Sequence, residues 1–473
     1  MSKPANSKSN EIRGPISARA AACRAVADAL LKRGFIGQAL AEMQTHGLRG
    51  RDAALASEVA LGAVRHLFTI EAVLGCVATY QPRHVSPRLR AVLATAAYQL
   101  IWLDRVPDFA AVDEAVNLAK RFAGHGEARM TNAVLRRLSN AIETRRTPWV
   151  PLAPRLIRVS WDQACAFNAP VLPEPQDDAS SYWAAALGER PRRHQQLIAA
   201  FGDEAARAIG WASQAAPPVV LIPNTLRLNM PAAQARLREA FGADVAVDDH
   251  GRGFVTGRGP LAHSPLLASG EFYVQDTTAQ ACADAAPLLP DQRILDLCAA
   301  PGGKSIALCL ARGDRGEIVA CDTNSARLAR LLQNVERLGL HSIHATQLPH
   351  PDAPLTPLGT FDLALVDAPC SNSGVIARRP EARLSLYDDK IASLTELQSG
   401  LLHRAAAVVR PGGALVYSTC SIEPIEDTEQ IRAFMTAESG WQLESETLHL
   451  PHWTGNLTDW RDGGFVSVLR RTS

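Results

Sequence analysis

Apolar residues in the first third of the chain recur at the spacing of a helix. From Ser17 to about Thr144, Ala- and Leu-rich segments place apolar residues three and four positions apart, as at Leu89, Val92 and Leu93. We therefore predict an all-α domain over residues 17–146, after a polar stretch at 1–16 that we expect to be disordered.

The period of the pattern changes after residue 146. Six prolines between Thr147 and Asp178 exclude a continuous helix there, and residues 147–185 are interpreted as a linker or an inserted loop. Residues 186–262, in which short helical stretches precede an extended run from Val219, are expected to form a small mixed α/β segment.

From residue 263 to 473, strand-length apolar runs alternate with helical periodicity. The predicted strands are 293–297, 317–321, 361–366 and 414–418, and the predicted helices are 304–311, 325–338 and 389–409. Such alternation predicts an α/β domain of Rossmann-like type with a doubly wound parallel sheet. A late strand at 464–470 is expected to close the sheet as an antiparallel hairpin.

Composition adds constraints on location and chemistry. The chain has no apolar run of 18 residues and no signal-peptide pattern, so we expect a cytoplasmic protein that does not enter a membrane. Its nine cysteines include no CxxC pair, which argues against a zinc site, and we expect reduced thiols, no metal and a monomer.

The charge is unevenly distributed. Residues 11–146 contain 19 Lys and Arg, 17 of them Arg, against 12 Asp and Glu, a net +7, whereas residues 147–473 carry a net −8. Arginine favours bidentate phosphate contacts, so the helical domain is a candidate for nucleic-acid binding. A merely solvated helical surface explains the charge equally well.

A small-residue loop joins the first predicted strand of the α/β domain to a helix. Its residues are Cys298, Ala299, Ala300, Pro301, Gly302, Gly303 and Lys304. Small residues let a ligand approach the backbone at a helix N-terminus. Cys298 stands where a phosphate-binding P-loop requires glycine, and the dinucleotide G-x-G-x-x-G spacing is absent. With Asp322, which ends the second strand and is placed to accept ribose hydroxyls, the loop indicates an adenosine cofactor.

Two cysteines fifty residues apart come after predicted strands. Asp367-Ala368-Pro369-Cys370 comes after one apolar run, and Ser418-Thr419-Cys420 comes after the next. Adjacent parallel strands place both thiols at one edge of the sheet, where they can face one substrate. Two thiols and a methyl-donating cofactor suit cytosine, because a thiolate that adds to carbon 6 makes carbon 5 nucleophilic. This mechanism alone does not assign the two thiols.

These motifs resemble the RNA (cytosine-5) methyltransferases of the Sun or RsmB type, which carry a NusB-like N-terminal domain. In the α/β domain the resemblance rests on 272–276, 296–304, Asp322, 367–371 and 418–421; in the helical domain it rests on Arg65 within 62–68, 98–100 and 132–136. It implies that Cys420 is the nucleophile, Cys370 assists release, and Asp367 touches both cofactor and cytosine. It also implies that residues 298–304 and Asp322 bind S-adenosylmethionine, and that the substrate is RNA, most simply small-subunit ribosomal RNA.

Two departures leave alternatives open. An acidic residue usually comes after the third strand near the adenine, but this chain has Leu348 there, with Gln347 and Asp352 as substitutes. The segment after Cys370 is also divergent, although Arg378, Arg379 and Arg383 in it are candidate phosphate contacts. Pro369-Cys370 would fit the Pro-Cys mechanism of DNA cytosine-5 methyltransferases. The rival function is a non-catalytic RNA-binding or ribosome-assembly factor that keeps the methyltransferase fold.

Overall fold

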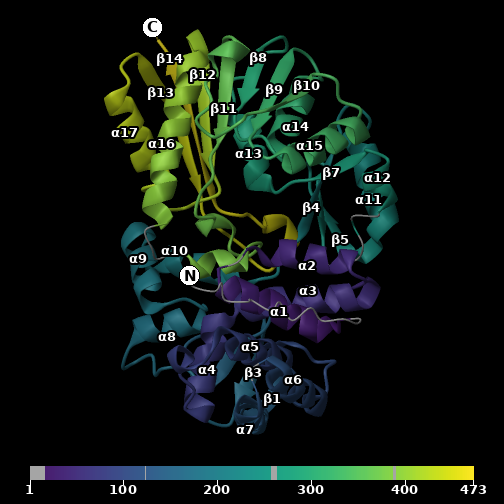
Figure 1. Ribbon diagram of the computed structural model, residues 1–473, viewed down its shortest axis with the longest axis vertical. Helices are drawn as coiled ribbons and strands as arrows, with labels where there is room; N and C mark the ends of the chain where they lie inside the picture. Colours follow the sequence, from purple (N-terminus) through teal and green to yellow (C-terminus); the bar gives the residue numbers. More distant parts are fainter. Residues whose placement is uncertain are drawn as a thin grey trace, which may run out of the picture. The chain divides into compact units, whose positions relative to one another are not determined.

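The computed structural model describes residues 16–32, 34–122, 124–256, 261, 264–386 and 390–472 (Figure 1). They divide into two compact units, one that runs through Arg193 and one that begins at His194. Helix α9 (Pro191–Phe201) contains the division.

The first unit is helical over most of its length, as its apolar spacing predicts. Its helices before residue 142 are α1 (Ala18–Leu30), α2 (Ile36–Thr45), α3 (Gly50–Arg65), α4 (Leu67–Ala78), α5 (Pro87–Trp102), α6 (Asp108–Phe122) and α7 (His125–Ala141). Helix α5 is buried along nearly its whole length and packs against α1, α3, α6 and α7. Ser86 fixes its start, because the side chain accepts a hydrogen bond from the Leu89 N–H and Pro87 occupies the first turn.

In the part of the chain that the structure describes, no helix by itself is long and apolar enough to cross a membrane. Helices α3 and α4, which meet at a bend of 72°, pass that test only when taken together.

The Pro-rich stretch differs from the linker or loop expected there. Strands β1 (Ile142–Pro148), β2 (Leu156–Arg158) and β3 (Gln163–Phe167) form an antiparallel sheet in the order β1-β3-β2, and α8 (Ala179–Ala186) comes after it. Strand β1 also begins inside the region predicted to be all helical. The prolines do not prevent the sheet because they stand at a strand end, in turns or in the loop after β3, where no ladder N–H is needed.

The second unit opens with the part of α9 from His194 onward, α10 (Asp203–Gln214) and a small antiparallel sheet of order β5-β6-β4-β7. Its strands are β4 (Val219–Pro223), β5 (Val245–Val247), β6 (Gly253–Val255) and β7 (Phe272–Val274), with α11 (Met230–Phe241) and α12 (Pro265–Ala268) between them. Buried Asn224 connects this sheet to the rest of the unit, because its side-chain amide donates to the Gly270 and Leu338 carbonyls at 3.1 and 3.0 Å. Because β7 pairs with β4, the small sheet extends past residue 262.

A seven-stranded sheet of order β10-β9-β8-β11-β12-β14-β13 forms the body of this unit (Figure 1). Its strands are β8 (Arg293–Asp296), β9 (Glu317–Asp322), β10 (Ile343–Gln347), β11 (Phe361–Asp367), β12 (Val409–Thr419), β13 (Trp441–His449) and β14 (Gly464–Arg471). The first five in chain order are parallel, whereas β14 lies antiparallel between β12 and β13. The predicted Rossmann-like fold and antiparallel closing strand are confirmed.

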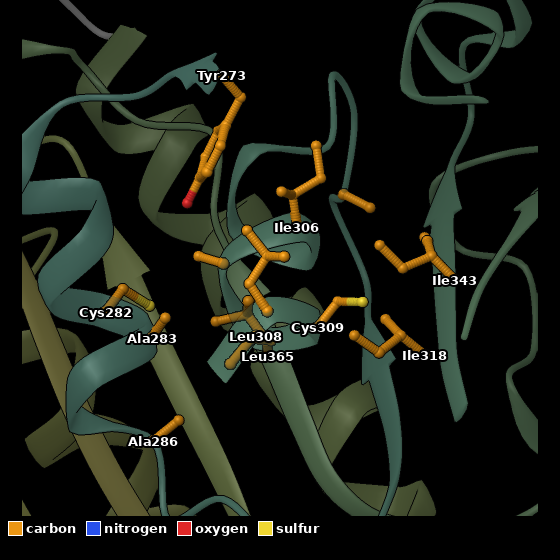
Figure 2. Close-up of a cluster of buried hydrophobic side chains, with 14 of the residues drawn as sticks. Tyr273, Cys282, Ala283, Ala286, Ile306, Leu308, Cys309, Ile318, Ile343 and Leu365 are labelled. Carbon is orange, nitrogen blue, oxygen red and sulfur yellow. The ribbon is translucent and has the colours of Figure 1, made fainter. Parts of the chain in front are cut away.

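Helices cover both faces of this sheet. On one face α13 (Thr277–Ala285), α14 (Gly303–Ala311) and α15 (Ser325–Leu338) contact the strands, and on the other α16 (Lys390–Val408) contacts β11, β12 and α17 (Thr428–Ala437). Figure 2 shows the first of these two cores, where Leu308 of α14 lies beside Leu365 of β11 and Cys282 of α13 belongs to the same cluster. Alternate strand residues fill the second core, so the sheet is buried on both faces, as its continuous apolar strands predict.

Candidate active site

The two cysteines meet where β11 and β12 end. These strands pair in parallel with Asp367 opposite Ser418, so the segments after them leave the sheet at the same edge. The Sγ atoms of Cys370 and Cys420 lie 3.0 Å apart, within hydrogen-bond reach but well beyond the roughly 2.05 Å of a disulfide bond. Cys370 is buried and Cys420 is half-buried, so Cys420 is the more accessible of the two thiols.

Asn372 holds the two cysteine loops in register. Its backbone is left-handed, with φ of 62°, a conformation that asparagine tolerates better than most residues. Its side-chain oxygen accepts the Cys420 thiol at 3.2 Å and an Arg379 N–H at 2.9 Å, while its amide donates to the Cys370 carbonyl at 3.0 Å. The Cys420 sulfur therefore has fixed neighbours on two sides.

The surroundings of Cys370 disfavour its thiolate form. The Cys420 contact, burial, and the charges of Cys420 and Glu426 raise the pKa of the Cys370 thiol well above its usual range. Cys370 therefore keeps its proton at neutral pH. A buried, protonated thiol beside a more accessible one gives the site a hydrogen-bond donor aimed at the second sulfur.

Asp367 and Lys304 link the thiol edge to the small-residue loop. Lys304 lies in the first turn of α14, and its ammonium pairs with the Asp367 carboxylate at 2.8 Å. Burial acts to lower the pKa of Lys304, but the charges of Asp367, Cys282 and Asp276 and the hydrogen bond to Asp367 together raise that pKa overall. The predicted loop and the predicted catalytic carboxylate thus share one charged contact.

The loop at 298–304 forms a cradle that needs small residues. Gly302 has φ of +108°, and a Cβ there would lie 2.9 Å from Leu331 Cγ. Asp296, at the end of β8, is fully buried, and it accepts Ser305 Oγ at 2.6 Å through one oxygen while the other has no partner. Gln275, also buried, lies beside Gly303 with neither amide atom hydrogen-bonded. Such unpaired buried groups suit a polar ligand that completes them.

Asp322 lies next to this loop, as the sequence predicts for the end of the second strand. It is buried, and one carboxylate oxygen accepts the Asn324 N–H at 2.9 Å. The other pairs with Arg327 at 3.3 Å, and Arg327 also donates to the Ala300 carbonyl. The Ala299 N–H donates to the Cys321 carbonyl at 2.9 Å. The structure therefore brings residues 298–304 and Asp322 together at one edge of the sheet.

The residues after the third strand, β10, differ in their suitability as ligand contacts. Gln347 lies opposite Asp322 in the β10–β9 pairing and is exposed, with its amide 3.4 Å from the Thr323 carbonyl. Leu348 is buried in the core on the α16 side, and Asp352 is exposed several residues farther on. Gln347 is thus the polar side chain at this strand end that directly neighbours Asp322.

The arginines after Cys370 are not equivalent. Arg378 pairs with buried Asp462 at 2.5 Å, and Arg383 is itself buried and donates to the Ser213 carbonyl. Both are structural, which corrects their interpretation as phosphate contacts. Arg379 is exposed and remains a candidate, although it also contacts Asn372.

Sequence reasoning missed Asn372, Gln275 and the buried Glu426 as parts of this site. Asn372 and Gln275 stand within or beside the motifs named above, but the contact of Asn372 with Cys420 joins residues 48 positions apart, and the Gln275 amide has no hydrogen-bond partner. Glu426 lies six residues after Cys420 and just before a helix, where an acidic residue ordinarily indicates a solvated N-terminal turn.

Comparisons with known proteins agree with this architecture. A model of the NusB family matches residues 16–140, and a model described as 16S rRNA methyltransferase RsmB/F matches residues 286–457. The chain is 30% identical to a probable ribosomal RNA small subunit methyltransferase B of Synechocystis, covering 85% of both chains. It is also 30% identical to the corresponding probable enzyme of Bacillus subtilis, covering 91% of this chain and 93% of that one.

A solved structure of a methyltransferase homologue from Pyrococcus horikoshii shares the fold. The TM-score is 0.52 at 24% identity, and the match covers 62% of this chain and 99% of the other. From the family models, the full-length relatives and this fold, we conclude that the chain belongs to the RsmB/F family of S-adenosylmethionine-dependent methyltransferases and carries a NusB-family helical domain.

Proposed function

We propose that this protein methylates carbon 5 of a cytosine in 16S ribosomal RNA through a covalent adduct with Cys420. The observation that carries the proposal is the 3.0 Å approach of the Cys420 and Cys370 sulfurs beside Asp367. The names of the relatives, which are small-subunit ribosomal RNA methyltransferases, support the substrate.

Cytosine needs activation because carbon 5 is a poor nucleophile in an aromatic, electron-poor ring. Addition of the Cys420 thiolate to carbon 6 makes the ring an enamine, whose carbon 5 can attack an electrophilic methyl group. S-adenosylmethionine supplies that group when bound. Residues 298–304 and Asp322 would hold it, and the unpaired oxygen of Asp296 and the amide of Gln275 fit a ligand with polar ends.

Release requires loss of the carbon 5 proton and cleavage of the carbon 6–sulfur bond. As the proton leaves to a base, its bonding electrons form the carbon 5–carbon 6 double bond, and Cys420 departs as a thiolate. Cys370, protonated and 3.0 Å away, can donate a hydrogen bond to that thiolate. Asp367, whose orientation the ion pair with Lys304 fixes, would be the carboxylate that approaches the cytosine.

The helical domain would bring the RNA to this site. Its net charge of +7 over residues 11–146 favours contacts with phosphates, and the cytosine must be unpaired or flipped outward to reach the thiols. Free cysteines throughout the chain suit a reducing compartment, so we place the protein in the cytoplasm.

The test is a methylation assay with defined products. Purified protein is incubated with labelled cofactor and either 16S rRNA or small subunits from a strain that lacks the gene, and digested nucleosides are analysed by mass spectrometry. We expect 5-methylcytidine at one position and none with Cys420→Ala. RNA binding with no methylated nucleoside would instead favour the non-catalytic assembly factor.

A further inference from the structure

Glu426 is a buried carboxylate surrounded by donors. Its side chain is fully buried between β12 and α17. One oxygen accepts the Ser371 N–H at 2.9 Å and the Gln398 amide at 3.0 Å. The other accepts the hydroxyls of Ser371 and Ser421 at 2.5 and 2.6 Å. Four donors on two oxygens satisfy a charge that would otherwise be very costly to bury.

The donors come from both cysteine loops. Ser371 comes directly after Cys370, and Ser421 directly after Cys420. Gln398 of α16 extends the contact, because the same amide group donates to the Pro369 carbonyl at 2.9 Å. The Glu426 backbone carbonyl also accepts a hydrogen bond from the Tyr417 hydroxyl at 2.7 Å. This bond anchors Glu426 to β12. One acidic residue thus connects the residues on each side of Cys370 with the residue after Cys420.

We propose that Glu426 is a positioning residue that sets the separation of the two thiols. Residues 369–371 and residues 420–421 follow two different strands. Hydrogen bonds to the one Glu426 carboxylate hold the two segments close together. Without the carboxylate, four buried donors lose their acceptor, and the two loops are left with fewer contacts, those of Asn372 among them, to keep the sulfurs at 3.0 Å. The effect of Glu426 on the thiol separation does not depend on the proposed function; only its expected effect on catalysis rests on that function.

Glutamine is the conservative replacement at this position. In Glu426→Gln the remaining oxygen can keep Ser371 N–H and Gln398, and the new NH₂ can donate to the two serine hydroxyls, which can rotate to accept it. Glu426→Ala removes every side-chain contact. The matched control is Glu429→Ala, which deletes an exposed carboxylate in the first turn of α17.

Dithiol capture measures the thiol separation without RNA or cofactor. Phenylarsine oxide forms one arsenic–sulfur bond with each of two adjacent thiols, and its oxygen leaves as water with the two thiol protons. Cys370→Ala, which has no pair, gives the background rate. We expect Glu426→Ala to capture the reagent ten- to a hundredfold more slowly, on the order of the cost of a 1 Å misplacement, and Glu426→Gln to restore most of the rate. Glu429→Ala should equal wild type.

Catalysis gives the second measurement. In Glu426→Ala the turnover number should fall while the Michaelis constant for RNA and the cofactor affinity stay near wild type, and Glu426→Gln should recover turnover. If Glu426→Ala does not fold, the double variant Ser371→Ala/Ser421→Ala removes the hydrogen bonds to one carboxylate oxygen and should slow capture in the same direction.

The outcomes separate this inference from the proposed function. Capture at the wild-type rate by a folded Glu426→Ala, or by the double serine variant, overturns the positioning role whatever the protein methylates. Slow capture that Glu426→Gln restores supports it even if no 5-methylcytidine is found, in which case the proposed function alone fails.

Discussion

Replacing Cys370 with alanine is expected to trap RNA on the protein. The Cys370 sulfur is 3.0 Å from that of Cys420 and keeps its proton, so its removal takes a hydrogen bond from the departing thiolate but leaves the attack of Cys420 possible. Positioned proton donors contribute about 10²- to 10⁴-fold, which corresponds to roughly 2.7 to 5.4 kcal/mol at about 1.36 kcal/mol per tenfold. Elimination should slow by that factor.

The size of this effect sets the assay. If the wild-type enzyme turns over about ten times per second, elimination in the variant falls to roughly 0.1 to 0.001 per second, giving adduct lifetimes from about ten seconds to about a quarter of an hour. Such adducts accumulate during a reaction with substrate RNA and cofactor, and they appear as a shifted band on denaturing electrophoresis. Cys321→Ala, which removes a buried thiol of β9, should show no band.

Two results would contradict the assignment. An adduct in Cys420→Ala that is absent from Cys370→Ala would reverse the two roles and place the chain with the Pro-Cys mechanism. Full methyl transfer by both variants would mean that neither sulfur bonds to the base, and the covalent mechanism would be wrong.

Three further changes test other parts of the site. Asp322→Ala should weaken cofactor binding by about 10- to 150-fold, the effect of losing charge-assisted hydrogen bonds, and unchanged affinity in calorimetric titration would remove Asp322 from the site. Arg129, Arg136 and Arg137 are exposed on α7, and replacing all three with alanine should weaken RNA binding. The slope of log affinity against log salt concentration should become shallower by up to about 0.9 per lost phosphate contact, while cofactor affinity, the control, stays unchanged. An unchanged slope would exclude this surface as an RNA contact. Burial raises the pKa of Asp296 from 3.8 to about 7, so the folded state binds an extra proton between these values and stability is lost as pH rises through them. Asp296→Asn keeps an acceptor for Ser305 and should remove up to about 4 kcal/mol of this pH dependence in denaturant unfolding; identical pH profiles would contradict the shift.

The parallel strands other than β10 could be predicted because each contains an apolar run next to a helical segment, whereas β10 reads Ile-His-Ala-Thr-Gln and has no such run. Strand β13 was missed because most of its residues are exposed and polar, as in Glu444 and Glu446, which suits the edge of a sheet but gives no apolar signal. The sheet β1-β3-β2 was missed because prolines near short strands indicate loops. Local sequence cannot specify such pairings, which depend on partners far along the chain.

In the site too, residues could be predicted where the neighbouring sequence identifies them and were missed where their contacts lie far along the chain. Cys370, Cys420 and Asp322 could be proposed because each stands at or just after the end of a recognisable strand, and the loop at 298–304 because its small residues are consecutive. Asn372 and Glu426 could not, since their importance lies in contacts with residues about fifty positions away. A buried acid has no sequence signature until its donors are known.

The position of β14 has a consequence for synthesis of the protein. This strand pairs with β12, which carries Ser418 and Thr419 just before the Cys420 nucleophile, yet it is the last strand of the sheet to leave the ribosome. Until then, β12 presents a long apolar edge that can pair with another nascent chain. The first unit can fold while translation continues, but the thiol site gains its final neighbour only after residue 464 is made. Catalytic competence should therefore appear late in translation, and a chain that stops in the β13–β14 hairpin should aggregate.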